Sequence, residues 1–181
     1  VLSMADSHAK PVDAVSVSCG PGSYTGLRIG VSMAKGICYG RNIPLIALPT
    51  LKVLSVPLLL MDELPENALL CPMIDARRME VYAQVFDASG VAQSEVVAEV
   101  VTEESFVEWR QRGKFVIFGN GAKKCEEVLS GAQWVAVAPS ARGLVRLAEE
   151  AFEAGQFEDI AYFEPFYLKE FLVIPSKKKL L

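Results

Sequence analysis

Histidine is nearly absent from this sequence, and cysteine is sparse. The single histidine, His8, excludes any site that needs two imidazole ligands, including the His-Glu-x-x-His hydrolases. The four cysteines contain no Cys-x-x-Cys pair, which argues against a cysteine-bound zinc ion and a thioredoxin-like dithiol. Each cysteine has apolar neighbours in the sequence, which is typical of reduced, buried thiols. We therefore expect a cytoplasmic protein with no metal site and no cofactor.

Excess positive charge and long hydrophobic runs are also missing. The 181 residues include 18 Lys and Arg against 22 Asp and Glu, and this balance disfavours a free-standing nucleic-acid binder. The most apolar run, from Val53 to Met61, is about half as long as a membrane-spanning helix and contains Pro57. The chain does have a globular composition, with 51% hydrophobic and 22% charged residues. It is long enough for one domain or two small lobes.

The hydrophobic pattern predicts alternating strands and helices. The expected strands span 14–19, 45–48, 69–75, 80–86, 95–101, 114–118 and 134–138, and the expected helices span 27–41, 50–54, 103–112, 122–129 and 140–154. Thr50 and Ser140 are expected to cap their helices, and Pro57 to interrupt the segment after residue 54. The β-rich middle predicts an antiparallel meander. Together these elements indicate an α/β fold with mixed sheets, in two lobes joined near residues 50 to 65.

The most informative local feature is the glycine-rich junction at residues 20–26, Gly-Pro-Gly-Ser-Tyr-Thr-Gly. Such a turn between a strand and a helix can aim backbone N–H groups at an anion. It matches neither the Walker loop nor the G-x-G-x-x-G pattern. The alternative, which the spacing favours, is a tight turn with Ser23 or Thr25 as the helix cap. Gly20, Gly22 and Ser23 are therefore candidate residues of an anion or nucleotide site.

Two further loops contribute candidates to that site. Asp75 ends a buried strand, where a carboxylate can hold a metal ion or a phosphate-bound water. The favoured alternative is a charged hairpin in which Asp75 bonds turn amides and the following arginines face water. Gly119 and Gly121 link another strand to a helix and could contact a nucleotide. Such glycines more often serve only to permit a positive φ.

The predicted helix at 27–41 has two apolar faces. One face holds Leu27, Val31, Ala34 and Cys38, and the neighbouring face holds Gly26, Gly30, Met33 and Ile37. A helix that is apolar over more than half its circumference must bury more than one side. One side can pack on the helix's own sheet, and the other needs a further layer from this chain or from a partner. The candidate partner-binding residues are Leu27, Gly30, Val31, Met33, Ala34, Ile37 and Cys38. The sequence leaves open which face meets the partner.

Several segments together resemble the bacterial TsaB family, also called YeaZ and described as glycoprotease-like. The segments are G-P-G-S-Y-T-G-L-R-I-G-V-S-M-A-K-G, N-I-P-L-I-A-L-P-T-L, M-I-D-A-R-R-M-E-V-Y, F-G-N-G-A and P-F-Y-L-K. The resemblance covers essentially the whole chain. It implies an actin-like, ribonuclease H-like ATPase fold with two lobes and mixed sheets. It also implies a function in making threonylcarbamoyladenosine at position 37 of tRNA.

The resemblance further implies a non-catalytic scaffold, so no catalytic residue is expected. The implied partners are a TsaD-like catalytic subunit, which carries the metal, and a TsaE-like ATPase. On this view the chain binds tRNA only through the complex, and no membrane is involved. We also expect the chain alone to form a homodimer, because without the opening strands and helix a sheet edge and the apolar flank of the helix at 27–41 would be exposed. The family's paired surface includes the helix after the glycine-rich turn. The alternative is an actin-like enzyme, either a glycoprotease-like peptidase or a small-molecule kinase. A kinase would need a carboxylate on each lobe, and only Asp75 could serve.

Members of the family open with a strand carrying an Ile-Asp-Thr-Ser-like motif, a hairpin and a long helix. This sequence does not contain them, so the resemblance implies an N-terminally truncated chain with an incomplete first lobe. We expect residues 1–50 to form the remnant of that lobe, 51–165 the second α/β lobe and 166–181 a C-terminal tail. Actin-like ATPases carry their first phosphate-binding carboxylate on the missing strand, so tight nucleotide binding is not expected.

Overall fold

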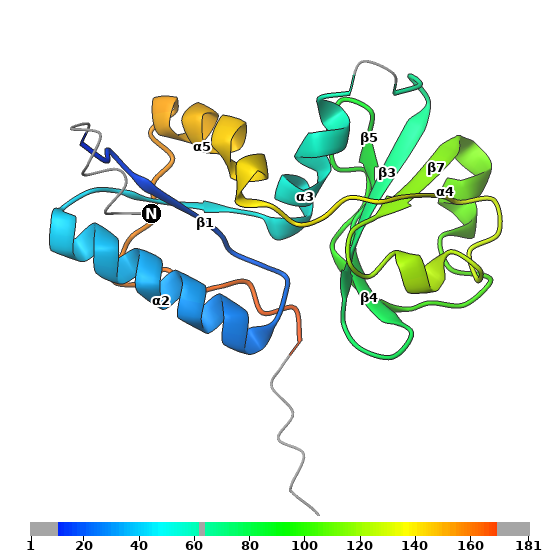
Figure 1. Ribbon diagram of the computed structural model, residues 1–181, viewed down its shortest axis with the longest axis horizontal. Coiled ribbons are helices and arrows are strands. Elements are labelled where there is room, and N and C mark those ends of the chain that lie inside the picture. The colour runs from blue at the N-terminus through cyan, green and yellow to red at the C-terminus, as the bar shows by residue number, and fades with distance from the viewer. Residues whose placement is uncertain (1–10, 62–63, 170–181) are drawn as a thin grey trace, which may run out of the picture.

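The computed structural model describes residues 11–61 and 64–169, which form two sheets. The two sheets lie at opposite ends of an elongated molecule (Figure 1). In chain order the α-helices and strands are β1 (Val15–Ser18), α2 (Tyr24–Arg41), β2 (Leu45–Leu48), α3 (Thr50–Leu59), β3 (Ala68–Asp75), β4 (Glu80–Ala83), β5 (Phe86–Asp87), β6 (Val97–Val100), α4 (Val107–Arg112), β7 (Lys114–Phe118), β8 (Gln133–Val135) and α5 (Leu144–Glu153). The predicted α/β class is confirmed.

The first sheet is a parallel pair of strands, β1 and β2, covered by a helix on each face. Successive side chains of a strand point to opposite faces, so Val15 and Val17 of β1 face α2, whereas Ser16 faces α5. Helix α2 covers one face, where Cys38 packs with Leu45. Helix α5 covers the other face, where Leu147 and Ala151 pack with Ile46. The sheet therefore lies between two helices about a hundred residues apart along the chain, with β2 mostly buried and β1 half-buried.

The position of α5 matters for the expected boundaries between the lobes. By its contacts α5 belongs to the sheet of β1 and β2, and Figure 1 shows the chain returning to that end of the molecule. The expected division into 1–50, 51–165 and 166–181 follows sequence position alone and separates α5 from the sheet that it covers. Those boundaries stay a prediction.

The second sheet is mixed and is centred on β3. This strand pairs antiparallel with β4 and β5 and parallel with β7, while β6 and β8 lie at the edges. The expected antiparallel meander is confirmed in the neighbouring strands β3, β4 and β6. Cys71 and Met73 of β3 face one apolar core, and Leu70 faces a second core formed with α3.

Helix α3 lies between the two sheets (Figure 1). Leu51 and Leu54 pack into the core of the second sheet. Val53 and Val56, on another side of the same helix, pack with α5 in the core of the first lobe. Because one short helix contributes to both cores, it holds the two lobes together.

The predicted start and end of α3 are wrong. The helix runs through Pro57 to Leu59, and its N-cap is Pro49 rather than Thr50. The Thr50 hydroxyl instead accepts a hydrogen bond of 2.9 Å from the Gly20 amide. Pro57 has no N–H for the Val53 carbonyl, and Gly143 lies so close to that oxygen that a Cβ there would be 2.5 Å away. A distant segment thus covers the exposed helix carbonyl.

Other predicted elements are shorter than expected. The helix predicted at 122–129 is a 3-10 turn at Lys123–Cys125, and the helix predicted at 103–112 begins only at Val107. The strand predicted at 80–86 is interrupted, because the Val85 amide bonds to the Ser94 hydroxyl instead of a neighbouring strand. Ser140 does act as a cap, since its hydroxyl accepts from the Arg142 amide, but it caps a 3-10 turn at Ala141–Gly143, and α5 itself begins only at Leu144. Within the described ranges, no helix is both long and apolar enough to cross a membrane.

Candidate partner-binding helix and interlobe cleft

The glycine-rich turn at residues 20–26 adopts the tight-turn alternative. Ser23 is the N-cap of α2, and its hydroxyl accepts a hydrogen bond of 3.3 Å from the Gly26 amide. Thr25 lies inside the first turn and does not cap it. Gly20 has a φ of 121°, and a Cβ there would lie 2.4 Å from the Phe166 carbonyl oxygen. Glycine is needed at position 20 for both reasons.

The structure separates the two apolar faces of α2. The face of Leu27, Val31, Ala34 and Cys38 is buried in the chain's own core, with no residue more than 8% exposed. Met33, on the other face, is 64% exposed. Burial also raises the pKa of the Cys38 thiol. Four of the seven candidate partner-binding residues therefore support the first lobe, and only Gly30, Met33 and Ile37 remain on the second face.

That second face is apolar, rich in glycine and wider than expected. It also contains Ile29, which is 59% exposed, together with Gly36 and Gly40. At 100° per residue, these residues fall with Met33 and Ile37 within about a third of the helix circumference. A Cβ added at Gly36 or Gly40 would meet no atom within 4 Å. These glycines are therefore not required by packing inside the described part of the chain. We call the surface of Gly26, Ile29, Gly30, Met33, Gly36, Ile37 and Gly40 the open face of α2.

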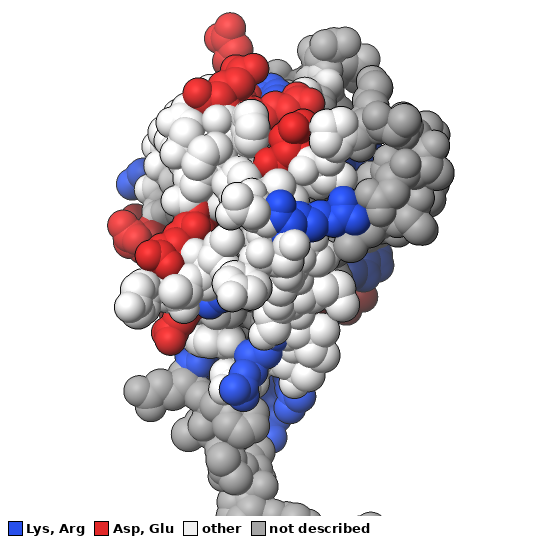
Figure 2. Space-filling view, turned by 90° about the vertical axis from the view of Figure 1, so that its left-hand side faces the viewer, with Lys and Arg blue, Asp and Glu red and all other residues white. Residues whose placement is uncertain are grey.

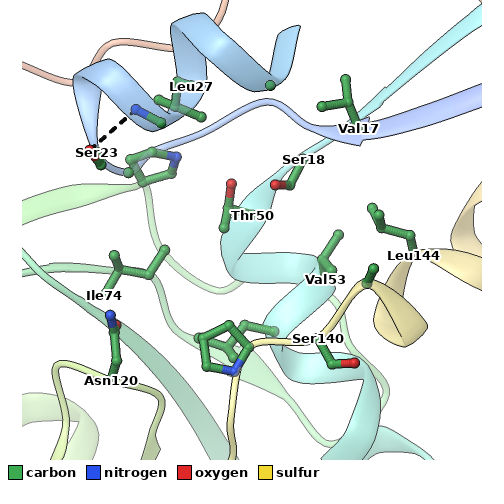
Figure 3. A pocket seen from close by; sticks show the side chains of 17 residues that line it. Val17, Ser18, Ser23, Leu27, Thr50, Val53, Ile74, Asn120, Ser140 and Leu144 are labelled. Atoms are coloured by element: carbon green, nitrogen blue, oxygen red, sulfur yellow. Dashed lines mark hydrogen bonds between the residues drawn. The ribbon is translucent and has the colours of Figure 1, made fainter. Parts of the chain in front are cut away.

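A cavity of about 430 Å³ lies between the lobes (Figure 3). Leu27, Val53 and Leu144 contribute apolar side chains, and none of the lining residues is charged. The hydroxyls of Thr50 and Ser140 line the cavity but already accept hydrogen bonds, from the Gly20 amide and the Arg142 amide respectively. Such a lining offers no cation to balance a polyphosphate.

The candidate nucleotide residues are only partly brought together. Gly22 and Ser23 line this cavity, whereas Asp75, Gly119 and Gly121 are not among its lining residues. The last two glycines permit close packing instead. A Cβ at Gly119 would lie 2.5 Å from the Met73 carbonyl oxygen, and one at Gly121 would lie 2.8 Å from the Asp75 amide nitrogen. Gly20 likewise serves the packing of the turn described above.

Asp75 takes part in the hairpin between β3 and β4. Its carboxylate accepts from the Arg77 amide at 3.0 Å and forms an ion pair with Lys124. Lys124 also donates to the carbonyl oxygens of Arg78 and Glu80, at 2.6 and 2.8 Å. The hydrogen bond from Lys124 holds the pKa of Asp75 below its usual range, and the Arg77 amide adds to the effect. In the described ranges no three His, Cys, Asp or Glu side chains are grouped to hold a metal ion.

The arrangement of the two sheets and the cleft identifies the class of fold. A parallel strand pair between two helices, joined through α3 to a mixed sheet with a cleft between them, is an actin-like, ribonuclease H-like α/β fold. A profile described as "TsaD: tRNA N6-adenosine threonylcarbamoyltransferase" matches residues 1–162, and the chain belongs to this family.

Curated relatives and solved structures agree with this assignment. The tRNA threonylcarbamoyladenosine biosynthesis protein TsaB of Escherichia coli is 27% identical over 93% of this chain and 76% of its own length. The Bacillus subtilis protein of the same name is 32% identical over 55% of this chain and 41% of its own length. A crystal structure from Pseudomonas aeruginosa, of an uncharacterized protein similar to peptidase YEAZ, superposes with a TM-score of 0.75. The two chains are 24% identical, and the match covers 93% of this chain and 80% of the Pseudomonas chain. At this level of identity the likeness shows the fold alone. The expected resemblance to TsaB and YeaZ is confirmed.

Proposed function

We propose that this chain is a non-catalytic partner subunit in the synthesis of threonylcarbamoyladenosine at position 37 of tRNA. The curated relatives named for that biosynthesis support the pathway. The open face of α2 is the observation that carries the role as a partner. Isolated exposed apolar residues are normal, but a continuous apolar helix face usually marks an interaction site.

The partner proposed for the open face is the TsaD-like catalytic subunit. Ile29 and Met33 are the large apolar side chains exposed there, and burying each would contribute roughly 1.5–3 kcal/mol. The glycines at 36 and 40 leave room for another helix to approach closely, because interaxial distance depends on the side chains at the contact. In the absence of that subunit, a second copy of this chain would cover the same face as a homodimer. A TsaE-like ATPase would join the assembled complex.

The absence of catalysis is also part of the proposal. The cleft lining has no charged residue, and the Asp75 carboxylate is already engaged by Lys124. The alternative, a kinase or peptidase of the same fold, would need free catalytic groups facing this cleft. The names of the relatives favour the partner role instead.

Substitution of Gly36 tests the proposal, because its effects on folding and on binding should have opposite signs. Gly36→Leu should stabilise the helix by about 0.5–1 kcal/mol, since leucine is the better helix former. The same side chain should obstruct a closely packed partner helix and weaken co-purification with the TsaD-like subunit by about tenfold or more. Loss of threonylcarbamoyladenosine from cellular tRNA should accompany weaker binding.

Ser32→Leu is the matched control. Ser32 is exposed on the polar side of α2, so the same leucine should leave co-purification unchanged there. Unaltered partner binding by Gly36→Leu, or equal loss in both variants, would remove the open face from consideration as the docking site. Failure of the wild-type chain to bind any TsaD-like subunit would refute the proposed function itself.

A further inference from the structure

A second cavity, of about 340 Å³, adjoins the first at Gly22 and Ser23. Its walls come from residues 22–25 at the start of α2, the hairpin at 75–82 and the segment 167–169. Three of its lining residues are Tyr24, Tyr82 and Tyr167, and we call it the tyrosine groove. Three of the segments that carry the family resemblance therefore meet at one surface, although they are widely separated in the sequence.

Contacts between distant parts of the chain hold the three walls in place. The Phe166 amide donates to the Cys19 carbonyl at 2.8 Å, which fixes the segment 167–169 beside the glycine-rich turn. Tyr167 then packs on Tyr24 with ring centroids 4.8 Å apart. At the far side of the groove, Lys169 forms an ion pair with Glu80 of β4. The groove is thus formed by both lobes and closed by the C-terminal segment.

The charges of the groove leave one cation without a counter-ion. Both lining carboxylates are paired, Asp75 with Lys124 and Glu80 with Lys169. The Arg77 side chain is exposed and makes no hydrogen bond or ion pair with any residue of the described ranges. It attracts Asp75 only weakly, as the last contribution to the lowered pKa of that carboxyl. Arg77 is therefore available to an anion.

The remaining walls favour an anion beside an aromatic ligand. The first turn of α2 contains no acidic residue, so the positive end of its helix dipole is not compensated there. The Arg28 guanidinium lies 5.6 Å from the Tyr24 ring centre and adds positive charge next to the aromatic pair. Acidic side chains gather elsewhere, for example at the α5 end of the face shown in Figure 2. The groove lining contains two acidic side chains, Asp75 and Glu80, and two basic ones, Arg77 and Lys169, so its formal charge is zero rather than negative.

We propose that the tyrosine groove binds one nucleotide unit of an RNA strand. Arg77 would contact the phosphate, together with the amides at the start of α2, and the exposed Tyr167 ring would stack on the base. Arginine suits phosphate because its guanidinium can donate two parallel hydrogen bonds. Tyrosine stacking accepts any base, so the groove would bind without strict sequence preference. The choice of RNA over other anions rests on the proposed function.

An acidic peptide is the competing ligand, but it uses only part of the groove. A carboxylate would satisfy Arg77 and leave the exposed Tyr167 ring without a ligand. A nucleotide uses the cation and the aromatic surfaces together, and a cavity of about 340 Å³ falls within the usual range for small-ligand sites. The larger cavity beside it has no charged lining residue and so lacks a phosphate partner.

Fluorescence anisotropy with labelled hexauridylate and the isolated chain tests the groove directly. Arg77→Ala should weaken binding about tenfold and reduce the slope of log affinity against log salt by about 0.7, the value for one phosphate contact on a single strand. Tyr167→Leu should weaken binding by about tenfold through lost stacking, and Tyr167→Phe should retain it.

Arg78→Ala is a closely matched control. Arg78 is the neighbouring exposed arginine of the same hairpin and, like Arg77, has a positive φ, but it does not line the groove. It should retain wild-type affinity. Equal losses for Arg77→Ala and Arg78→Ala would indicate diffuse attraction and overturn the proposal, as would no binding by the wild type or equally strong competition by hexaglutamate. Co-purification with the TsaD-like subunit is scored separately, so failure of the proposed function remains distinguishable from failure of the groove.

Discussion

A carboxylate introduced at two adjacent positions of α2 should have two different effects. Ala34 is 5% exposed and packs with Cys38 and Leu45, so Ala34→Glu would bury an unpaired charge. That costs several kcal/mol of folding free energy, a large part of the total of about 5–15 kcal/mol. At about 2–4 °C per kcal/mol for a chain of this size, the melting temperature should fall by roughly 10 °C or more.

Met33→Glu should leave the fold intact. Met33 is 64% exposed, so its replacement keeps the new carboxylate in water and should change stability by no more than about 0.5 kcal/mol. In a complex formed through the open face the same carboxylate would be buried without a partner. The expected loss of affinity for the TsaD-like subunit is about a hundredfold or more.

Thermal unfolding followed by circular dichroism, together with calorimetric titration of the partner, separates the two effects. Ser32→Glu serves as the control because Ser32 is exposed but lies on the polar side of the helix. It should alter neither quantity. A melting temperature lowered equally by Met33→Glu and Ala34→Glu would contradict the assignment of the faces. Wild-type affinity in Met33→Glu would show that the partner binds elsewhere, and the stretch from Phe166 onward would be the next surface to test.

Three further outcomes follow from the same contacts. Gly121→Ala should destabilise the chain by about 1–3 kcal/mol in urea unfolding, because the added Cβ would lie 2.8 Å from the Asp75 amide, while Gly40→Ala should be neutral or stabilising. Lys124 lowers the pKa of Asp75, so this ion pair makes its full contribution to folding stability above the unfolded-state pKa of about 3.9. That contribution is lost as pH falls through the lower folded-state pKa of Asp75. Lys124→Met should therefore flatten the acid limb of a stability–pH curve, and an unchanged limb would exclude the pair as its cause. Light scattering should show concentration-dependent self-association through the open face, which Met33→Glu abolishes; a wild-type monomer at every concentration would contradict it.

Features determined by a few neighbouring residues were predictable from the sequence. Ser23 caps α2 and Ser140 caps the turn before α5, because a hydroxyl bonding an amide two or three residues later needs no distant partner. The continuation of α3 through Pro57 was not predictable in this way. At that place Gly143 lies against the Val53 carbonyl, and this contact joins segments far apart in the chain.

The two faces of α2 show the same limit. Helical periodicity correctly separated Leu27, Val31, Ala34 and Cys38 from Met33 and Ile37, since that division depends only on the repeat of the helix. It could not show which face packs on the sheet, because an apolar surface shows no preference among the layers that can cover it. Ile29 was missed, although its spacing of four residues from Met33 places both on the open face.

Each motif that contributes to the tyrosine groove was interpreted correctly by itself, but the sequence did not show that these motifs meet at one surface. The turn at 20–26 is a helix cap and Asp75 is a hairpin residue, as the more conservative interpretation of each predicted. Yet the ion pair that engages Asp75 in the hairpin also neutralises it, and this leaves Arg77 as the unbalanced charge. Tyr167 reaches Tyr24 only because the Phe166 amide binds the Cys19 carbonyl, a contact across most of the chain. Arg77 was expected only to face water. In the structure it lines a groove with residues from two distant segments, and local sequence patterns cannot place those segments together.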